Sequence, residues 1–135
     1  MKNIASTIAI VMITLTVALT GCTKDSNTTP DPGRSSFIGK WSVSPTKLTY
    51  EVTISADPNS STGVFISNFA MIGTTYPPAG ASIKGNTITL DANQVIGNGL
   101  TINGSGTLSG TKIAWHYTIF DGADLTTVNE TYTRE

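Results

Sequence analysis

Residues 111–120 read TKIAWHYTIF, and in this stretch apolar and polar side chains alternate. The apolar set, which would point to one side of an extended chain, comprises Ile113, Trp115, Tyr117 and Ile119. Such a period of two is typical of a β-strand with one face on a core and the other toward solvent.

The same alternation recurs along most of the chain, including residues 47–56 and 100–109. Turn-forming pairs that tolerate positive φ angles separate these runs, namely Gly85-Asn86, Asn98-Gly99, Ser109-Gly110 and Asp121-Gly122. The pattern predicts strands at residues 37–44, 47–56, 63–70, 81–84, 86–91, 94–97, 100–109 and 111–120, with 125–134 as a candidate ninth.

Short links between successive strands predict an all-β, mostly antiparallel meander. One polar and one apolar face per strand favour closure into an up-and-down β-barrel of about eight strands, because closure removes the sheet edges. A two-sheet β-sandwich is the alternative that periodicity leaves open. Gly104 and Gly106 would face inward, where missing side chains permit tight coiling at a barrel bend.

The first 21 residues have the features of a secretion signal: Lys2, then an uncharged apolar run from Ile4 to Leu19. This run is short for the roughly 20 residues that cross a bilayer. The ending Leu19-Thr-Gly-Cys22 resembles the bacterial lipoprotein box, which implies acyl chains such as palmitate on Cys22. An uncleaved anchor, or secretion with a free Cys22 thiol, are the alternatives.

We therefore expect three segments: a signal peptide at 1–21, a flexible tether at 22–35 and a β-barrel domain at 36–135. The lipid anchor would hold the domain at the cell envelope, as an outer-membrane lipoprotein facing the periplasm or the cell surface. Without Lys2 the chain has seven basic and nine acidic residues, and no clustered basic face that would attract nucleic acid.

The start of the first predicted strand, Phe37-Ile-Gly-Lys-Trp41, carries a Gly-x-Trp motif. It resembles the first strand of the calycin superfamily, which includes lipocalins, fatty-acid-binding proteins and avidins. Residues 85–90 and 104–110 are similar to small lipocalin-like lipoproteins of the Bacteroidetes. The resemblance implies that Trp41 closes one barrel end and that Arg134 packs over it. The helix that lipocalins pack on the barrel has no evident counterpart in the sequence.

If the barrel is hollow, aromatic side chains would line a cavity for a small apolar or amphiphilic ligand. These candidates are Trp41, Tyr50, Phe65, Trp115, Tyr117 and Tyr132. In the last strand Glu130 and Arg134 share a face with Tyr132. They would either pair with each other or cap the barrel end, or they would anchor the ligand.

No residue pattern points to catalysis. His116 is the only histidine and lies on the polar face, and the pair Asp121 and Asp124 fits a hairpin turn better than a calcium site. We expect no enzymatic activity, catalytic residue, metal or cofactor. With a filled barrel, the protein would instead be an envelope interaction or structural protein, acting through residues 71–80, or an inhibitor of an enzyme.

Overall fold

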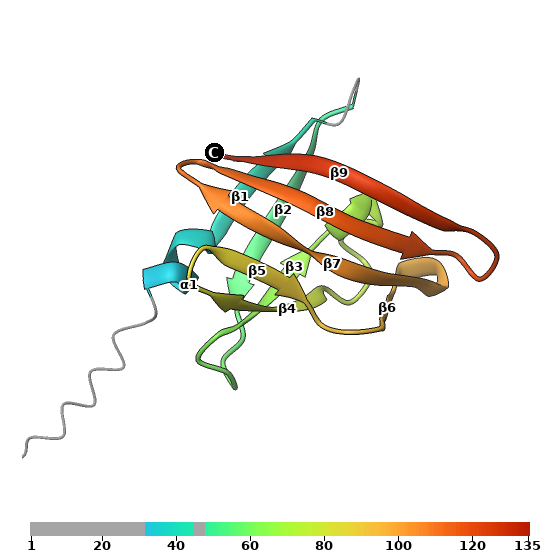
Figure 1. Cartoon of the computed structure of the whole chain (residues 1–135), viewed down its shortest axis with the longest axis horizontal. Helices are drawn as coiled ribbons and strands as arrows, with labels where there is room; N and C mark the ends of the chain where they lie inside the picture. Colours follow the sequence, from blue (N-terminus) through green and yellow to red (C-terminus); the bar gives the residue numbers. More distant parts are fainter. Residues whose placement is uncertain (1–31, 45–47) are drawn as a thin grey trace, which may run out of the picture.

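The computed structural model describes residues 32–44 and 48–135, and the proposed signal peptide, Cys22 and most of the tether lie outside them. It contains a closed antiparallel barrel of eight strands with a ninth strand attached (Figure 1). The elements are α1 (Pro32–Phe37), β1 (Gly39–Val43), β2 (Tyr50–Ala56), β3 (Gly63–Ser67), the 3₁₀ turn η1 (Phe69–Met71), β4 (Ala79–Lys84), β5 (Thr87–Leu90), β6 (Gln94–Ile96), the 3₁₀ turn η2 (Gly97–Gly99), β7 (Leu100–Ser109), β8 (Lys112–Phe120) and β9 (Leu125–Arg134). Each predicted strand segment coincides with one of these strands, although β4 begins at Ala79, two residues before the predicted segment 81–84.

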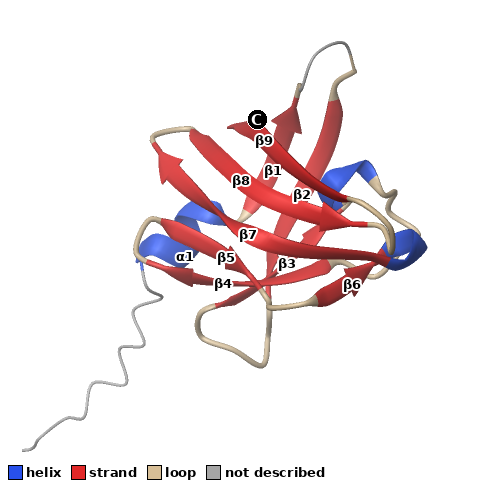
Figure 2. Cartoon of the chain, turned by 45° about the vertical axis from the view of Figure 1, so that its right-hand side comes forward, coloured by secondary structure: helices blue, strands red, loops and turns tan. Residues whose placement is uncertain are grey.

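Neighbouring strands of the barrel run in the order β5-β4-β3-β2-β1-β9-β8-β7. The additional pairing of β5 with β7 closes the barrel. β7, β8 and β9 run side by side across the front, with β1, β2 and β3 crossing behind them (Figure 2). The structure therefore confirms the predicted barrel and excludes the alternative two-sheet sandwich. The candidate ninth segment, β9, is a full barrel strand, and β6 is the extra one.

β6 continues β5 along the same edge of β7 after a break in register. Thr89 pairs with Ser105 and Gln94 with Ile102, so five steps along β5–β6 match three along β7. At this break the Gln94 side chain binds Gly80 of β4, whose carbonyl also accepts from the Asp91 amide at 3.0 Å. Its Oε1 accepts from the Gly80 amide at 2.7 Å, and its Nε2 donates to the Gly80 carbonyl at 2.6 Å.

The barrel interior is filled by one contiguous cluster of apolar side chains, to which every strand contributes. Its largest members are Trp41, Trp115, Tyr117, Tyr132, Phe37 and Phe69. Among the described residues no polar or charged residue is fully buried.

Two predicted inward positions differ from the structure. Leu48 is 56% exposed, because β2 begins only at Tyr50 and the alternation before it is not part of the sheet. Phe65 lies opposite Ser55 on the outer face of β3, since Val64 and Ile66 are the inward pair. Neither residue lines the interior.

Gly106 provides the space that the largest inward side chain of β8 occupies. It pairs with Trp115, and a Cβ added at Gly106 would lie 2.9 Å from the Trp115 ring and 2.8 Å from Ile113. Gly104 has a φ of 152°, where an L-residue is strained, and its added Cβ would collide with Tyr117. Both glycines thus permit the close approach of β7 and β8, and the tight coiling at a bend expected from the sequence stays a prediction.

α1 begins at Pro32, inside the segment expected to be tether, and the sequence analysis did not predict it. It is attached to the turn after β2: the Arg34 guanidinium donates to the carbonyls of Asp57, Ser60 and Ser61 at 2.7–3.0 Å. A six-residue helix is too short for a hydrophobic period to be recognised. Within the described ranges, no helix has the length and apolar character needed to span a bilayer.

Candidate functional site at the seam between β1 and β9

β9 is twice as long as β1, and this difference leaves part of β9 without a neighbour on one side. In the described chain the two strands pair only from Trp41 opposite Arg134 to Val43 opposite Tyr132. Residues 125–131 of β9 pair with β8 but not with β1. We call this uncovered stretch the seam.

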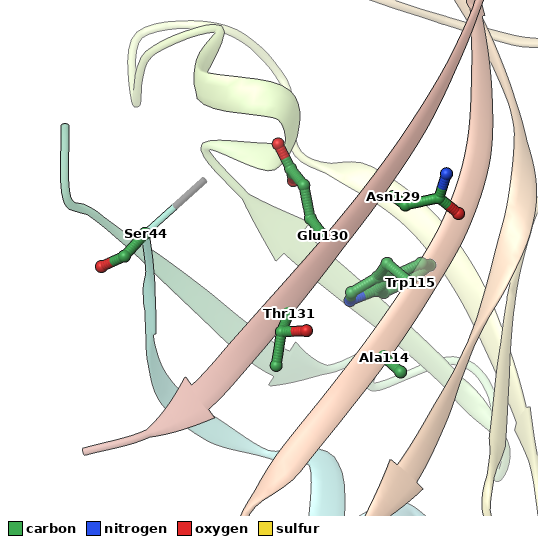
Figure 3. Close-up of a pocket in the computed structure, with 6 residues that line it drawn as sticks. All are labelled: Ser44, Ala114, Trp115, Asn129, Glu130 and Thr131. Carbon is green, nitrogen blue, oxygen red and sulfur yellow. The ribbon is translucent and has the colours of Figure 1, made fainter. Parts of the chain in front are cut away.

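An open cavity of about 360 Å³ lies at the seam. It is lined by Ser44, Ala114, Trp115, Asn129, Glu130 and Thr131. In Figure 3 the Glu130 side chain leaves the edge of β9 on the side where Ser44 lies, and Trp115 lies beside it on β8. Trp115 and Glu130 are direct cross-strand partners, so their side chains project next to each other.

The Glu130 carboxylate connects the two walls of the barrel across the seam. Its Oε2 accepts hydrogen bonds from the hydroxyls of Tyr50 on β2, at 3.1 Å, and of Tyr117 on β8, at 3.0 Å. Its other oxygen, Oε1, has no partner among the described residues, and no described cation pairs with it. Glu130 is half-buried. The carboxylate thus keeps one acceptor oxygen free.

The three tyrosines near this carboxylate are held in the neutral form. Burial, and then the negative charge of Glu130, raise the pKa of Tyr50 and of Tyr117 above the ordinary value. Burial also raises the pKa of Tyr132, to which Tyr50, Tyr117 and Glu130 add. At neutral pH Tyr50 and Tyr117 therefore remain hydrogen-bond donors to Glu130. We call Tyr50, Tyr117, Glu130 and Tyr132 the tyrosine–glutamate cluster.

One polar atom beside this cavity has no hydrogen-bond partner in the described chain. It is Nε1 of Trp115, a side chain that is 2% exposed. In Figure 3 the indole nitrogen is at the end of Trp115 that faces β9. The Tyr132 hydroxyl, also buried, interacts with the hydroxyl of Tyr50. An unsatisfied buried polar group costs about 1–3 kcal/mol, so the Trp115 N–H marks a place where a bound group would be stabilising.

Three of the aromatic side chains predicted to line a ligand cavity, Trp115, Tyr117 and Tyr132, instead pack around Phe69. Phe69, at the start of η1, lies with its ring centroid 5.2 Å from that of Trp115 and 4.8 Å from that of Tyr117. The ring centroid of Tyr132 lies 5.6 Å from that of Trp115. These rings occupy the barrel interior, which leaves the seam as the side from which the cluster is approached.

The sequence analysis placed Phe69 in a strand, not at the centre of this group. Asn68 has a left-handed backbone, with φ of 59°, and this turns the chain so that η1 carries Phe69 inward. The Asn68 side chain holds the turn by accepting from the Gly73 amide at 2.8 Å. An asparagine before an aromatic residue at a strand end is the signal that would have indicated the turn.

The structure separates the predicted site residues into two groups. Tyr50, Trp115, Tyr117, Glu130 and Tyr132 come together at the seam. Arg134 and Trp41 lie at the other end of the paired strands, where the guanidinium carbon is 4.6 Å from the indole centroid. Glu130 and Arg134 therefore do not form the ion pair that was one of the two structural expectations.

The remaining chemical candidates are located on the surface. His116 is exposed, and its Nδ1 is 2.8 Å from the Asn129 side-chain oxygen. Asp121 closes the β8–β9 hairpin, as predicted, by accepting from the amides of Ala123 and Asp124. Residues 32–44 and 48–135 contain no group of three His, Cys, Asp or Glu side chains suited to hold a metal ion.

Fold and site together define a closed antiparallel β-barrel with a filled interior and a polar, aromatic cluster reached from its side. No protein-family model, curated protein or solved structure matches the chain. The eight-stranded barrel is compatible with the fold that the calycin resemblance implies, and Trp41 contacts Arg134 as that resemblance implies.

Proposed function

We propose that this protein is a membrane-tethered, non-enzymatic binding protein of the cell envelope that takes a small amphiphilic ligand at the seam. The observation that carries the proposal is the incomplete hydrogen bonding beside an open cavity. Glu130 and Trp115 are cross-strand partners that both line the cavity, and the free Glu130 oxygen and the Trp115 indole N–H lack hydrogen-bond partners in the described chain. A bound molecule would satisfy these groups, as polar groups in ligand sites do.

The tether follows from the lipoprotein-box resemblance at Cys22, which lies outside the described residues. Two or more acyl chains give stable anchoring, whereas one does not. The absence of a nucleophile–base pair in the site supports binding without turnover: Glu130 is held by two phenols and contacts no activated hydroxyl, thiol or imidazole.

The experiment uses the two tryptophans as reporters in an NMR spectrum of the indole N–H groups. The Trp41 N–H donates to the Phe37 carbonyl at 2.8 Å, so it is an internal reference, while the Trp115 N–H is unpartnered. Octanoate, octan-1-ol and octylamine are titrated separately, because they share one chain and differ in head group. A saturable shift of the Trp115 signal with at least one probe, and a stationary Trp41 signal, is the expected result.

A second candidate function is that of an envelope interaction protein, and the filled interior favours it. Its surface would include the segment 71–80, where Met71 and Tyr76 are exposed. The same titration separates the two candidates. No movement of the Trp115 signal with any of the three probes would rule out the ligand-binding proposal in favour of this one.

A further inference from the structure

We infer that the ligand group recognised at the seam is a primary ammonium that carries an oxygen acceptor a few bonds away, as in 2-aminoethanol. The inference rests on the proposed binding function and adds the chemical class of the ligand. It depends on the charge of Glu130, on the free oxygen of its carboxylate and on the unpartnered indole N–H of Trp115.

The charge comes first. Among the described residues, Glu130 is the only charged one that lines the seam cavity, and its carboxylate has no cationic partner there. A half-buried carboxylate between aromatic side chains is poorly hydrated, so a cation that reaches Oε1 forms a charge-assisted hydrogen bond. An anionic ligand would be repelled here, and a neutral one would leave the charge uncompensated.

The acceptors determine which kind of cation fits. An ammonium has three N–H donors and no acceptor. Glu130 Oε1 is the free acceptor at this cavity, and Thr131, the next residue of β9, also lines the cavity. A quaternary ammonium has no N–H to give to these oxygens.

The single free donor determines what lies beside the ammonium. The Trp115 indole N–H can only donate, and Trp115 is directly opposite Glu130 across the strand pair. A ligand that places an oxygen a few bonds from its nitrogen would satisfy this donor while the ammonium binds Glu130. A sugar is a poorer fit, because Trp115 is 2% exposed and offers no ring face for stacking.

The test compares four small probes on the purified full chain, with the Trp115 and Trp41 indole signals as readout. Ethanolamine should shift the Trp115 signal at the lowest concentration, and ethylamine should require a higher one because it lacks the oxygen. Ethylene glycol, which lacks the charge, and tetramethylammonium, which lacks N–H donors, should leave the signal unchanged. Ethylene glycol or tetramethylammonium binding as well as ethanolamine would overturn the inference.

Variants locate the contact. Glu130→Gln keeps the shape and removes the charge, and it should raise the Kd for ethanolamine by about tenfold or more. The matched control is Asp124→Asn, which removes an exposed carboxylate in the β8–β9 turn and should leave the Kd unchanged. An unmoved Trp41 signal shows that each variant is folded. Equal ethanolamine binding by Glu130→Gln contradicts the inference.

The same ammonium and oxygen occur in a free amino alcohol and in a phospholipid head group. Vesicles of phosphatidylethanolamine and of phosphatidylcholine distinguish these sources, since only the first carries N–H donors. Competition by phosphatidylethanolamine vesicles alone assigns the lipid head group, and no competition assigns the free molecule. If octanoate or octan-1-ol shifts Trp115 while both amines fail, the binding function stands and the ammonium inference is wrong.

Discussion

The guanidinium carbon of Arg134 lies 4.6 Å from the centre of the Trp41 ring, and both side chains bind the end of α1. The Trp41 indole N–H donates to the Phe37 carbonyl, and Arg134 donates to the carbonyls of Ser36 and Ile38. These are carbonyls that a helix leaves unsatisfied at its C-terminus, where a cation is also favourable. The two residues thus join the first helix to the first and last strands.

We predict that Trp41→Ala lowers the free energy of unfolding by about 3–5 kcal/mol, as truncation of a large buried aromatic side chain does. Chemical denaturation followed by circular dichroism measures it. Trp41→Phe keeps most of the buried ring and loses the bond to Phe37, so its loss should be smaller. An equal loss in both variants would contradict the role given to ring burial.

Gly106→Ala should destabilise the barrel by about 1–3 kcal/mol, because the added methyl group overlaps Trp115 and Ile113. The matched control is Thr107→Ala, the exposed neighbour on the same strand, with an expected change of at most about 0.5 kcal/mol. Thermal unfolding of both variants gives the comparison. If Gly106→Ala is as stable as the control, the close approach of β7 and β8 is not required for packing.

Because of the tyrosine–glutamate cluster, we predict that the free energy of unfolding changes with pH in the alkaline range. The folded-state pKa values of Tyr50 and Tyr117 are raised, so below the ordinary value of 10.0 both folded and unfolded chains keep these protons. Above that pH only the unfolded chain releases them, and the free energy of unfolding falls as pH rises. Urea unfolding at a series of pH values above 9 should show this decline. Tyr50→Phe should decline less steeply, and a decline as steep as that of the native chain would refute the assignment.

Membrane attachment is predicted to depend on the thiol of Cys22. Cys22→Ser should move the protein out of the membrane pellet or block its maturation, since no acyl chain can be added. Thr23→Ser, at the next position, is the matched control and should pellet like the native chain. Persistence of Cys22→Ser in the pellet, at its normal processed size, would exclude the lipoprotein proposal.

The strands were predictable because period-two alternation directly reflects one buried face. β7, β8 and β9 match their predicted segments almost residue for residue. α1 was not predictable, because two of the contacts that hold it are distant in sequence: Arg34 binds the turn after β2, and Arg134 binds the end of the helix. The exposure of Leu48 could not be foreseen either, since alternation does not tell where a strand starts to pair.

The members of the site could be predicted, but not its position. Glu130, Tyr132 and Tyr117 alternate on inward faces, which is visible in the sequence. That they are reached from the side depends on β1 ending at Val43 while β9 continues past it. The sequence predicted a first strand of residues 37–44, and its length concealed the seam. Phe69 filling the interior depends on the turn at Asn68, a local backbone feature.

The attachment of α1 also has a mechanical consequence. A pull on the chain at residue 32 loads the three bonds from Arg34 to the turn after β2, and then the contacts from the end of α1 to Trp41 and Arg134. Because Arg134 belongs to the last strand, force that enters at the first described residue is shared with the strand that closes the barrel. We therefore expect tension at that residue to act on β1 and β9 together.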